Sequence, residues 1–293
     1  MTPTQHQFGG DWTAVKLERV RKYLAAYATI MAKKKYRFAY IDAFAGTGYR
    51  ALKEDEAQEG LLLPEFAEQE AEEFLEGSAR IALQVKPRFT KYIFIEKIQH
   101  RFDELTKLKA EFPELENDIE LVNQEANSYL ADLCQNYKWD KNRAVLFLDP
   151  YGMQVSWHTV ETIAKTKAID LWYLFPLGVA VNRLLKNDGN INEPQRRKLD
   201  TIFGTTDWYE AFYETTTRRG LLYDQTATRK VVSSKAIGQY FVGRLKKIFA
   251  GVAENPLPLY NSRNNPLYLL CFASGNPVGS KMAIKIAQDI LAR

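Results

Sequence analysis

Short apolar segments recur along this chain, and patterns typical of helices separate them. Each segment has the length of a strand and is continuously apolar, which is typical of strands buried on both faces. The five segments are "RFAYIDAF" at 37–44, "KYIFIEK" at 91–97, "IELVN" at 119–123, "AVLFLDPYG" at 144–152 and "IDLWYLFPLG" at 169–178. This alternation predicts an α/β fold with a mostly parallel central sheet and helices on both faces.

The helices are predicted from apolar residues repeated at spacings of three and four. Residues 13–33 show this pattern and predict an amphipathic helix, with Lys16, Arg19 and Lys22 on its other faces. Further helices are expected at 78–85, with Ser78 as the N-cap, and at 98–111, 126–136 and 156–166.

The pattern changes after the fifth strand. Residues 179–250 predict helices without strands, and we interpret them as a helical insertion that is a candidate region for binding a substrate or a partner. The chain then closes with a strand in "NPLYLLCFASGNP" and a helix at 277–292. We therefore expect the main part of the α/β core at 1–178, the insertion at 179–250 and the completion of the core at 251–293.

Composition excludes several classes of protein. The chain has 293 residues, of which 46% are hydrophobic, so it can bury a full core. Cys134 and Cys271 lie in apolar runs without a nearby Cys or His, so neither a disulfide framework nor a metal site is predicted. The N-terminal "MTPTQHQFGGDW" lacks an export pattern, and no segment approaches 18 uncharged apolar residues. We expect a cytoplasmic protein with no membrane span.

Charge is divided unevenly along the chain, although the net charge is only +4. Residues 54–76 contain ten acidic residues and no Lys or Arg, so the rest of the chain carries +14; we interpret this acidic segment as a surface insertion. Residues 179–250 contain thirteen Lys or Arg and seven Asp or Glu. This excess is compatible with an anionic partner such as nucleic acid, and equally with a solvated helical surface.

Polar or glycine-rich features follow the ends of four predicted strands. They are Asp42 with "AFAGTG", Glu96, "NQEAN" at 123–127 and "DPYG" at 149–152. In open parallel sheets, ligands bind beyond the carboxyl ends of the strands, so these features are expected to line one crevice.

The chemistry of these residues favours a nucleoside-bearing cofactor. Gly46 and Gly48 let the backbone turn sharply and approach a ligand, and Glu96 suits paired sugar hydroxyls. The glycine pattern lacks the third Gly of a dinucleotide site, and no P-loop pattern is present. S-adenosylmethionine, with an adenosine and a zwitterionic tail, fits the remaining pattern best.

These motifs carry a resemblance to known proteins. "IDAFAGTG", the acidic residue that closes the second strand and "FLDPYG" resemble the Rossmann-like class I S-adenosylmethionine-dependent methyltransferases. More narrowly, the order of "VKLERVRKYL", "YIDAFAGTG", "GSA", "FIEK", "FLDPYG" and "NPLYLLCFAS" is similar to the three-Cys-motif partner protein family (TcmP). That family is named for occurring beside a radical-SAM-like protein with three cysteines, so the resemblance implies a partner of that kind.

The resemblance also implies roles for individual residues. Glu96 would hold the ribose hydroxyls, and Gln124 or Glu125 would lie near the adenine. The implied cofactor-binding set is Asp42, Ala43, Phe44, Gly46, Thr47, Gly48, Ser78, Glu96, Lys97 and Gln124.

The residues Asp149, Pro150 and Tyr151 resemble the D-P-P-Y motif of enzymes that methylate exocyclic amines of bases, and the resemblance makes them the catalytic candidates. In that chemistry the Asp side chain and a backbone carbonyl orient the amine, and an aromatic ring stacks on the base. This sequence has one proline and places its aromatic residue one position early.

Two alternatives keep the fold without the reaction: a non-catalytic partner subunit, and an adaptor that binds nucleic acid through the basic helical region. Trp157 and His158 could form a substrate lip, although a Trp in an amphipathic helix more often belongs to the core. The aromatic residues of "TTDWYEAFYE" could stack on bases, but burial explains them more simply.

Overall fold

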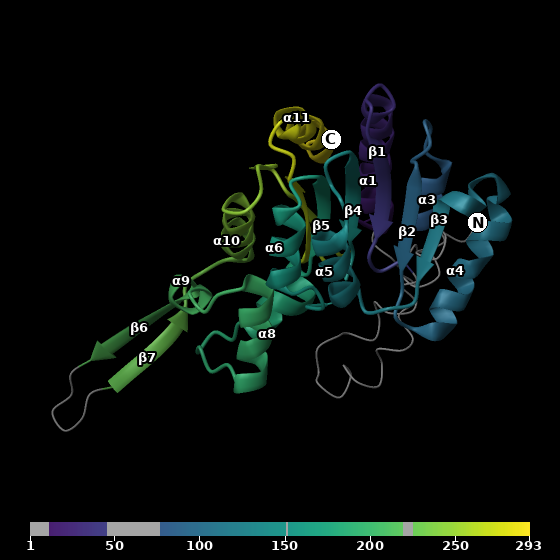
Figure 1. Ribbon diagram of the computed structural model, residues 1–293. Helices are drawn as coiled ribbons and strands as arrows, with labels where there is room; N and C mark the ends of the chain where they lie inside the picture. The colour runs from purple at the N-terminus through teal and green to yellow at the C-terminus, as the bar shows by residue number, and fades with distance from the viewer. Residues whose placement is uncertain (1–11, 46–76, 151, 219–224) are drawn as a thin grey trace, which may run out of the picture.

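The computed structural model describes residues 12–45, 77–150, 152–218 and 225–293 (Figure 1). Within these residues the main sheet has eight strands. They are β1 (Arg37–Asp42), β2 (Lys91–Ile95), β3 (Ile119–Val122), β4 (Asn142–Leu148), β5 (Ile169–Phe175), β8 (Gly251–Val252), β9 (Leu257–Tyr260) and β10 (Pro266–Ser274).

The strand order is β3-β2-β1-β4-β5-β10-β8, and β9 also pairs with β10. Strands β1 to β5 are parallel to one another, whereas β10 is antiparallel to β5, β8 and β9. The prediction of a mostly parallel central sheet is therefore confirmed. The short strands β8 and β9 were not predicted, because two to four residues carry no readable period.

Two layers of helices cover the sheet (Figure 1). One face carries α1 (Trp12–Met31), α3 (Ser78–Gln84), α4 (Gln99–Glu111) and α11 (Ser280–Leu291). The other carries α5 (Ala126–Asn136), α6 (Trp157–Lys165), α8 (Glu193–Phe203) and α10 (Ser234–Lys246). On β4, Ala144 and Leu146 face one core while Val145 and Phe147 face the other, which explains why the strand is continuously apolar.

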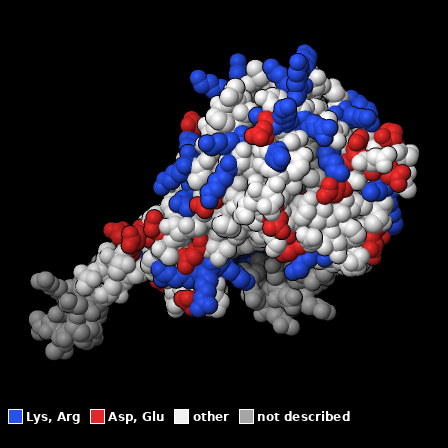
Figure 2. Space-filling model, in the orientation of Figure 1, with Lys and Arg blue, Asp and Glu red and all other residues white. Residues whose placement is uncertain are grey.

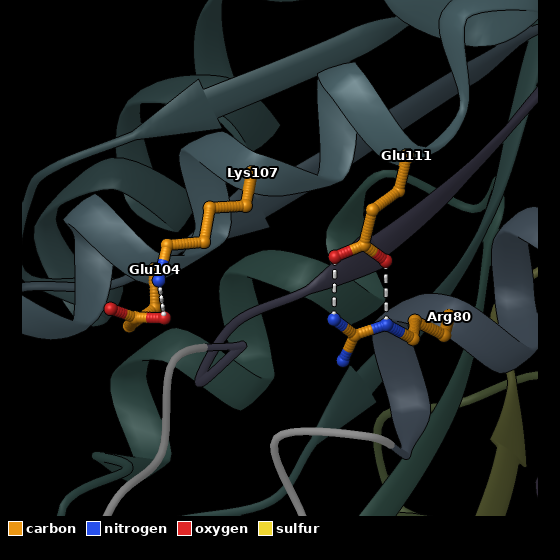
Figure 3. A network of polar contacts seen from close by, with 4 residues as sticks. All are labelled: Arg80, Glu104, Lys107 and Glu111. Atoms are coloured by element: carbon orange, nitrogen blue, oxygen red, sulfur yellow. Dashed lines mark hydrogen bonds and ion pairs between the residues drawn. The ribbon is translucent and has the colours of Figure 1, made fainter.

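Polar contacts hold α1 and α3 in place on the first face. The Tyr23 hydroxyl of α1 donates to Asp170 Oδ2 at 2.8 Å, and Asp170 Oδ1 accepts from the Ser274 hydroxyl at 2.6 Å. Arg80 of α3 forms a two-pronged ion pair with Glu111 of α4, at 2.8 Å from Nε and 2.7 Å from Nη2 (Figure 3). The first contact joins α1 to β5, and the second joins α3 to α4.

Figure 3 also shows an ion pair between Lys107 and Glu104 within α4.

The N-cap of α3 differs from the prediction. Gly77 occupies that position and Ser78 is the first helical residue, so the Ser78 side chain makes no capping hydrogen bond.

The prediction that residues 179–250 contain no strands is wrong. They include a two-stranded antiparallel sheet of β6 (Tyr213–Arg218) and β7 (Gln225–Lys230), which extends away from the core (Figure 1). These strands have few apolar residues, so they show no alternation. Their β-branched threonines stabilise the pairing instead, and Thr215 and Thr228 form a cross-strand hydroxyl contact at 3.1 Å.

The other regular elements that the structure describes in this region are helices, as predicted. Besides α8 and α10, these are the short helices α7 (Asn182–Leu184) and α9 (Trp208–Phe212), preceded by a turn of π-helix at Leu177–Val181. Elsewhere in the chain, a 3₁₀ turn at Pro113–Asp118 precedes β3. Phe241 of α10 stacks on Phe175 of β5 with ring centroids 3.9 Å apart. This helix therefore belongs to the core that the sheet builds.

Candidate functional site

The carboxyl ends of β1 and β4 lie side by side in the middle of the sheet. The chain continues from β1 outward to β2 and β3, and later from β4 outward to β5 on the opposite side. The strand order thus reverses between β1 and β4, which is where open α/β sheets bind their ligands. Asp42 ends β1 and pairs with Phe147, and the Ala43 N–H donates to the Phe147 carbonyl at 3.1 Å. This pairing brings Asp42 and Asp149 to the same edge of the sheet, and the charge of Asp149 acts on Asp42.

Lys16 joins these carboxylates from the overlying helix α1. Its Nζ atom lies 2.7 Å from Asp149 Oδ2, and the two side chains are only 2% and 7% exposed. The Trp12 ring lies 5.0 Å from the same ammonium. The prediction that Lys16 lies on an outer face of the helix is therefore wrong. Its spacing to Val20 and Tyr23, two buried residues, places it on the inner face, which the sequence could have revealed.

Burial dominates the electrostatics of Asp42. It raises the pKa of the carboxyl from 3.8 to about 6, and the charge of Asp149 acts in the same direction. The nearby Ser78 hydroxyl, the Phe44 N–H and the Tyr40 hydroxyl lower the pKa without offsetting burial. The Phe44 N–H and the Tyr40 hydroxyl donate to this carboxyl at 3.3 and 3.2 Å.

Two opposing effects act on the pKa of Asp149. Burial raises the pKa of this carboxyl, while the charge and the hydrogen bond of Lys16 lower it. The buried group thus contains two carboxyls, Asp42 and Asp149, and one ammonium. When all three are ionised, the group carries a net negative charge away from water. A ligand with a positive charge would balance it.

Ser78 adds a donor to this group. Its hydroxyl oxygen is buried, and it has no hydrogen-bond partner of good geometry among the described residues. This hydroxyl lies beside the Asp42 carboxyl, whose pKa it lowers, so it belongs to the same buried polar group.

Glu96 follows β2 and is also buried, at 6% exposed. Burial raises the pKa of its carboxyl, although the Ile98 N–H, which donates to Oε1 at 2.6 Å, and the charge of Arg101 act against this. Asn123, after β3, donates from Nδ2 to the carbonyls of Glu96 and Lys97 at 2.9 and 3.2 Å. The ends of β2 and β3 are therefore joined beside the first group.

The other predicted residues lie in varied surroundings. Ala43 and Pro150 are buried, Phe44 is half-buried against the core, and Lys97 and Gln124 are exposed. Glu125 caps α5 by accepting from the N–H groups of Asn127 and Ser128. Gly46, Thr47, Gly48 and Tyr151, together with the acidic segment at 54–76, lie outside the described residues. The roles of all these residues stay predictions.

Most of the aromatic residues that were candidates for contacting a substrate or bases belong to the core. Trp157 is 3% exposed and packs edge-on to Phe241, while Trp208 and Phe212 are fully buried. Tyr209 is half-buried, and the Arg196 guanidinium lies 4.6 Å above its ring. Burial is therefore the better interpretation of "TTDWYEAFYE".

Within the ranges that the structure describes, no group of His, Cys, Asp and Glu side chains could hold a metal ion, and both cysteines are free and buried. The described helices include none that is long and apolar enough to cross a membrane.

No family model and no curated protein matches the chain. Among solved structures, the chain is similar to a Legionella pneumophila protein of the family DUF519, with 13% identity over 98% of this chain and 93% of the other and a TM-score of 0.48. It is also similar to an S-adenosylmethionine-dependent methyltransferase from Clostridium acetobutylicum (11% identity, 88% and 91% covered, TM-score 0.36). A third is spermidine synthase from Thermotoga maritima (10% identity, 91% and 60% covered, TM-score 0.37). These scores are low, and it is the strand order of the sheet that identifies a Rossmann-like α/β fold.

Proposed function

We propose that this protein binds S-adenosylmethionine at the carboxyl ends of β1 and β4 and transfers its methyl group to a nitrogen atom. One observation carries the proposal: Asp42 and Asp149 are buried together at the reversal point of the sheet, and the ammonium of Lys16 pairs with Asp149. S-adenosylmethionine supplies a sulfonium and an ammonium, and binding either cation next to this group would balance its charge.

The residues present fit such a ligand. Asp42 would accept from the ligand's ammonium, and the Ser78 hydroxyl, which lies beside Asp42, would donate to the ligand's carboxylate. Glu96 has one carboxylate oxygen fixed by the Ile98 N–H, which leaves the other to accept from a ribose hydroxyl. The glycine loop at Gly46 and Gly48 keeps the role predicted from the sequence.

The cofactor supplies an electrophilic methyl group, and the chain needs only to orient the acceptor. Asp149 uses Oδ2 for Lys16, and Oδ1 accepts no hydrogen bond from a described residue. Oδ1 and the Pro150 carbonyl would accept from an amine and direct its lone pair. The ammonium of Lys16 would hold Asp149 ionised and in one orientation. An exocyclic amine of a nucleic-acid base is the acceptor that this motif favours.

The ion pair also supports a second candidate. Because Lys16 already occupies one oxygen of Asp149, the pair could serve only to fix α1 over the sheet. The protein would then be a non-catalytic subunit that binds the nucleotide. The resemblance to the three-Cys-motif partner family extends both candidates to a radical-SAM-like partner with three cysteines.

Calorimetric titration of S-adenosylmethionine tests the shared part of both candidates. We expect binding by the native protein, a loss of about ten-fold or more in D42N, and native affinity in the control D289N, which removes an exposed carboxylate on α11. No binding by the native protein would refute the cofactor proposal.

Labelled methyl transfer to DNA, RNA and protein then separates enzyme from binder. D149N keeps the shape of the side chain and an oxygen for Lys16, so it should fold and bind the cofactor while transferring more slowly. Equal transfer by D149N and native protein would remove Asp149 from the reaction, and binding without any transfer would favour the non-catalytic subunit.

A further inference from the structure

Two basic segments far apart in the sequence meet at the amino ends of β1 and β4. They are "KKKYR" at 33–37 and "YKWDKNR" at 137–143. The strands are neighbours in parallel register, with Arg37 opposite Asn142, and the Arg37 N–H donates to the Lys141 carbonyl at 3.0 Å. The two segments therefore form one surface, which we call the amino-end face.

The amino-end face carries an excess of positive charge. Its two segments contain seven Lys or Arg and one acidic residue, Asp140. Lys33, Lys34, Lys35 and Lys141 are exposed, and in the ranges that the structure describes none of the lysines on this face forms an ion pair. Figure 2 shows Lys and Arg gathered over the upper end of the molecule, where β1 and β4 begin in Figure 1.

Aromatic rings lie among these charges and are held in fixed positions. Tyr36 and Tyr137 are 38% and 47% exposed. The guanidinium of Arg143 lies 4.3 Å above the Tyr36 ring and donates from Nη1 to the Trp139 carbonyl at 2.8 Å. The Trp139 ring packs edge-on to Tyr137, with centroids 5.2 Å apart, and its Nε1 donates to the Cys134 carbonyl at 3.2 Å. The four side chains are thus one continuous, anchored cluster.

We propose that the amino-end face binds single-stranded nucleic acid. Unpaired lysines would contact successive phosphates, and the exposed Tyr36 and Tyr137 rings would stack on bases, which only a single strand leaves accessible. Lys165 and Lys167 extend the positive charge toward β5, because the Ala144 N–H that follows Arg143 donates to the Ala168 carbonyl at 3.2 Å.

This surface is distinct from the site at the carboxyl ends. Arg37 and Asp42 lie at opposite ends of β1, so the face is separated from Asp42 by about 17 Å at roughly 3.3 Å per residue step. The face would therefore anchor a strand without presenting a base to Asp149. The proposal does not depend on cofactor binding or on methyl transfer.

Fluorescence anisotropy with labelled oligo(dT) and oligo(U) tests the proposal at increasing salt. The variant K34Q/K35Q/K141Q should bind more weakly, and its log–log salt slope should fall by about 2, at about 0.7 per lost phosphate contact. The control K186Q/R229Q/K235Q removes the same charge from exposed residues outside this face, and it should keep the native slope. An equal loss in the control would overturn the proposal.

The ring stacking has its own variant. Y36L/Y137L keeps the charge and the apolar packing, so it should bind about ten-fold more weakly or worse with an unchanged salt slope. Native affinity in this variant would overturn the assignment of a single strand. Vesicles containing phosphatidylserine are the competing probe, and binding to vesicles without binding to either oligonucleotide would also overturn it.

Discussion

The difference in the free energy of unfolding between D42N and the native protein should change sign with pH. Asp42 is fully buried, and its pKa is raised from 3.8 to about 6 by burial and by the charge of Asp149. Above about pH 6 the ionised Asp42 carboxylate therefore lowers the free energy of unfolding. The difference between the two pKa values corresponds to about 3 kcal/mol.

The sign follows from proton linkage. Between pH 3.8 and about 6 the folded state binds the proton more tightly than the unfolded state, so the native protein loses stability as the pH rises through this window. D42N has no such loss. It does lose an acceptor for the Tyr40 hydroxyl, at about 1 kcal/mol. We expect D42N to be less stable than native protein by about 1 kcal/mol below the window and more stable by about 2 kcal/mol above it.

Urea denaturation of native protein and D42N at several pH values across this window measures the difference. Asp170, whose pKa is also raised to about 6 by burial, is present in both proteins and cancels. D289N controls for the loss of one surface carboxylate. A stability difference between D42N and native protein that stays constant with pH would refute the claim that Asp42 is held ionised at a cost.

Substitutions at Lys16 and at two glycines test the packing of the fold. K16M leaves Asp149 buried without its partner and should lower the free energy of unfolding by about 3–5 kcal/mol in urea denaturation. The double variant K16M/D149L should recover much of this loss. A loss below about 1 kcal/mol in K16M would contradict a desolvated pair. G204A should lower the melting temperature strongly, because Gly204 has φ +65° and a Cβ there would lie 2.0 Å from Trp157 Cδ1. In the matched variant G243A, the new Cβ in helix α10 has no atom within 4 Å, so the free energy of unfolding should rise by about 0.5–1 kcal/mol. Equal effects of G204A and G243A would contradict this account.

The fold could largely be predicted because its strands are buried on both faces. Continuous apolar segments such as 144–152 and 169–178 are typical of strands covered on both faces, and β4 and β5 form there. The hairpin of β6 and β7 could not be predicted in this way. Its twelve residues include five threonines and only two apolar residues, Tyr213 and Ala227, so they show no hydrophobic period.

The candidate site could be predicted only in part. Asp42, Glu96 and Asp149 follow directly from the rule that ligands bind beyond strand ends, and the structure places all three there. Lys16 was missed because a lysine is almost never fully buried unless it is paired, and its partner lies 133 residues away. The helical spacing of Lys16 was readable, but the pairing required knowing that α1 crosses the end of β4.

The same strand order produces both proposed surfaces. Because β1 and β4 are parallel neighbours, their carboxyl ends bring Asp42 beside Asp149, and their amino ends bring "KKKYR" beside "YKWDKNR". Had either strand been antiparallel, each acidic residue would lie among the lysines, and neither a buried negative group nor an unpaired positive face would form. One pairing in the sheet therefore separates the charges to opposite ends, which suits a polyanion at one end and a cationic cofactor at the other.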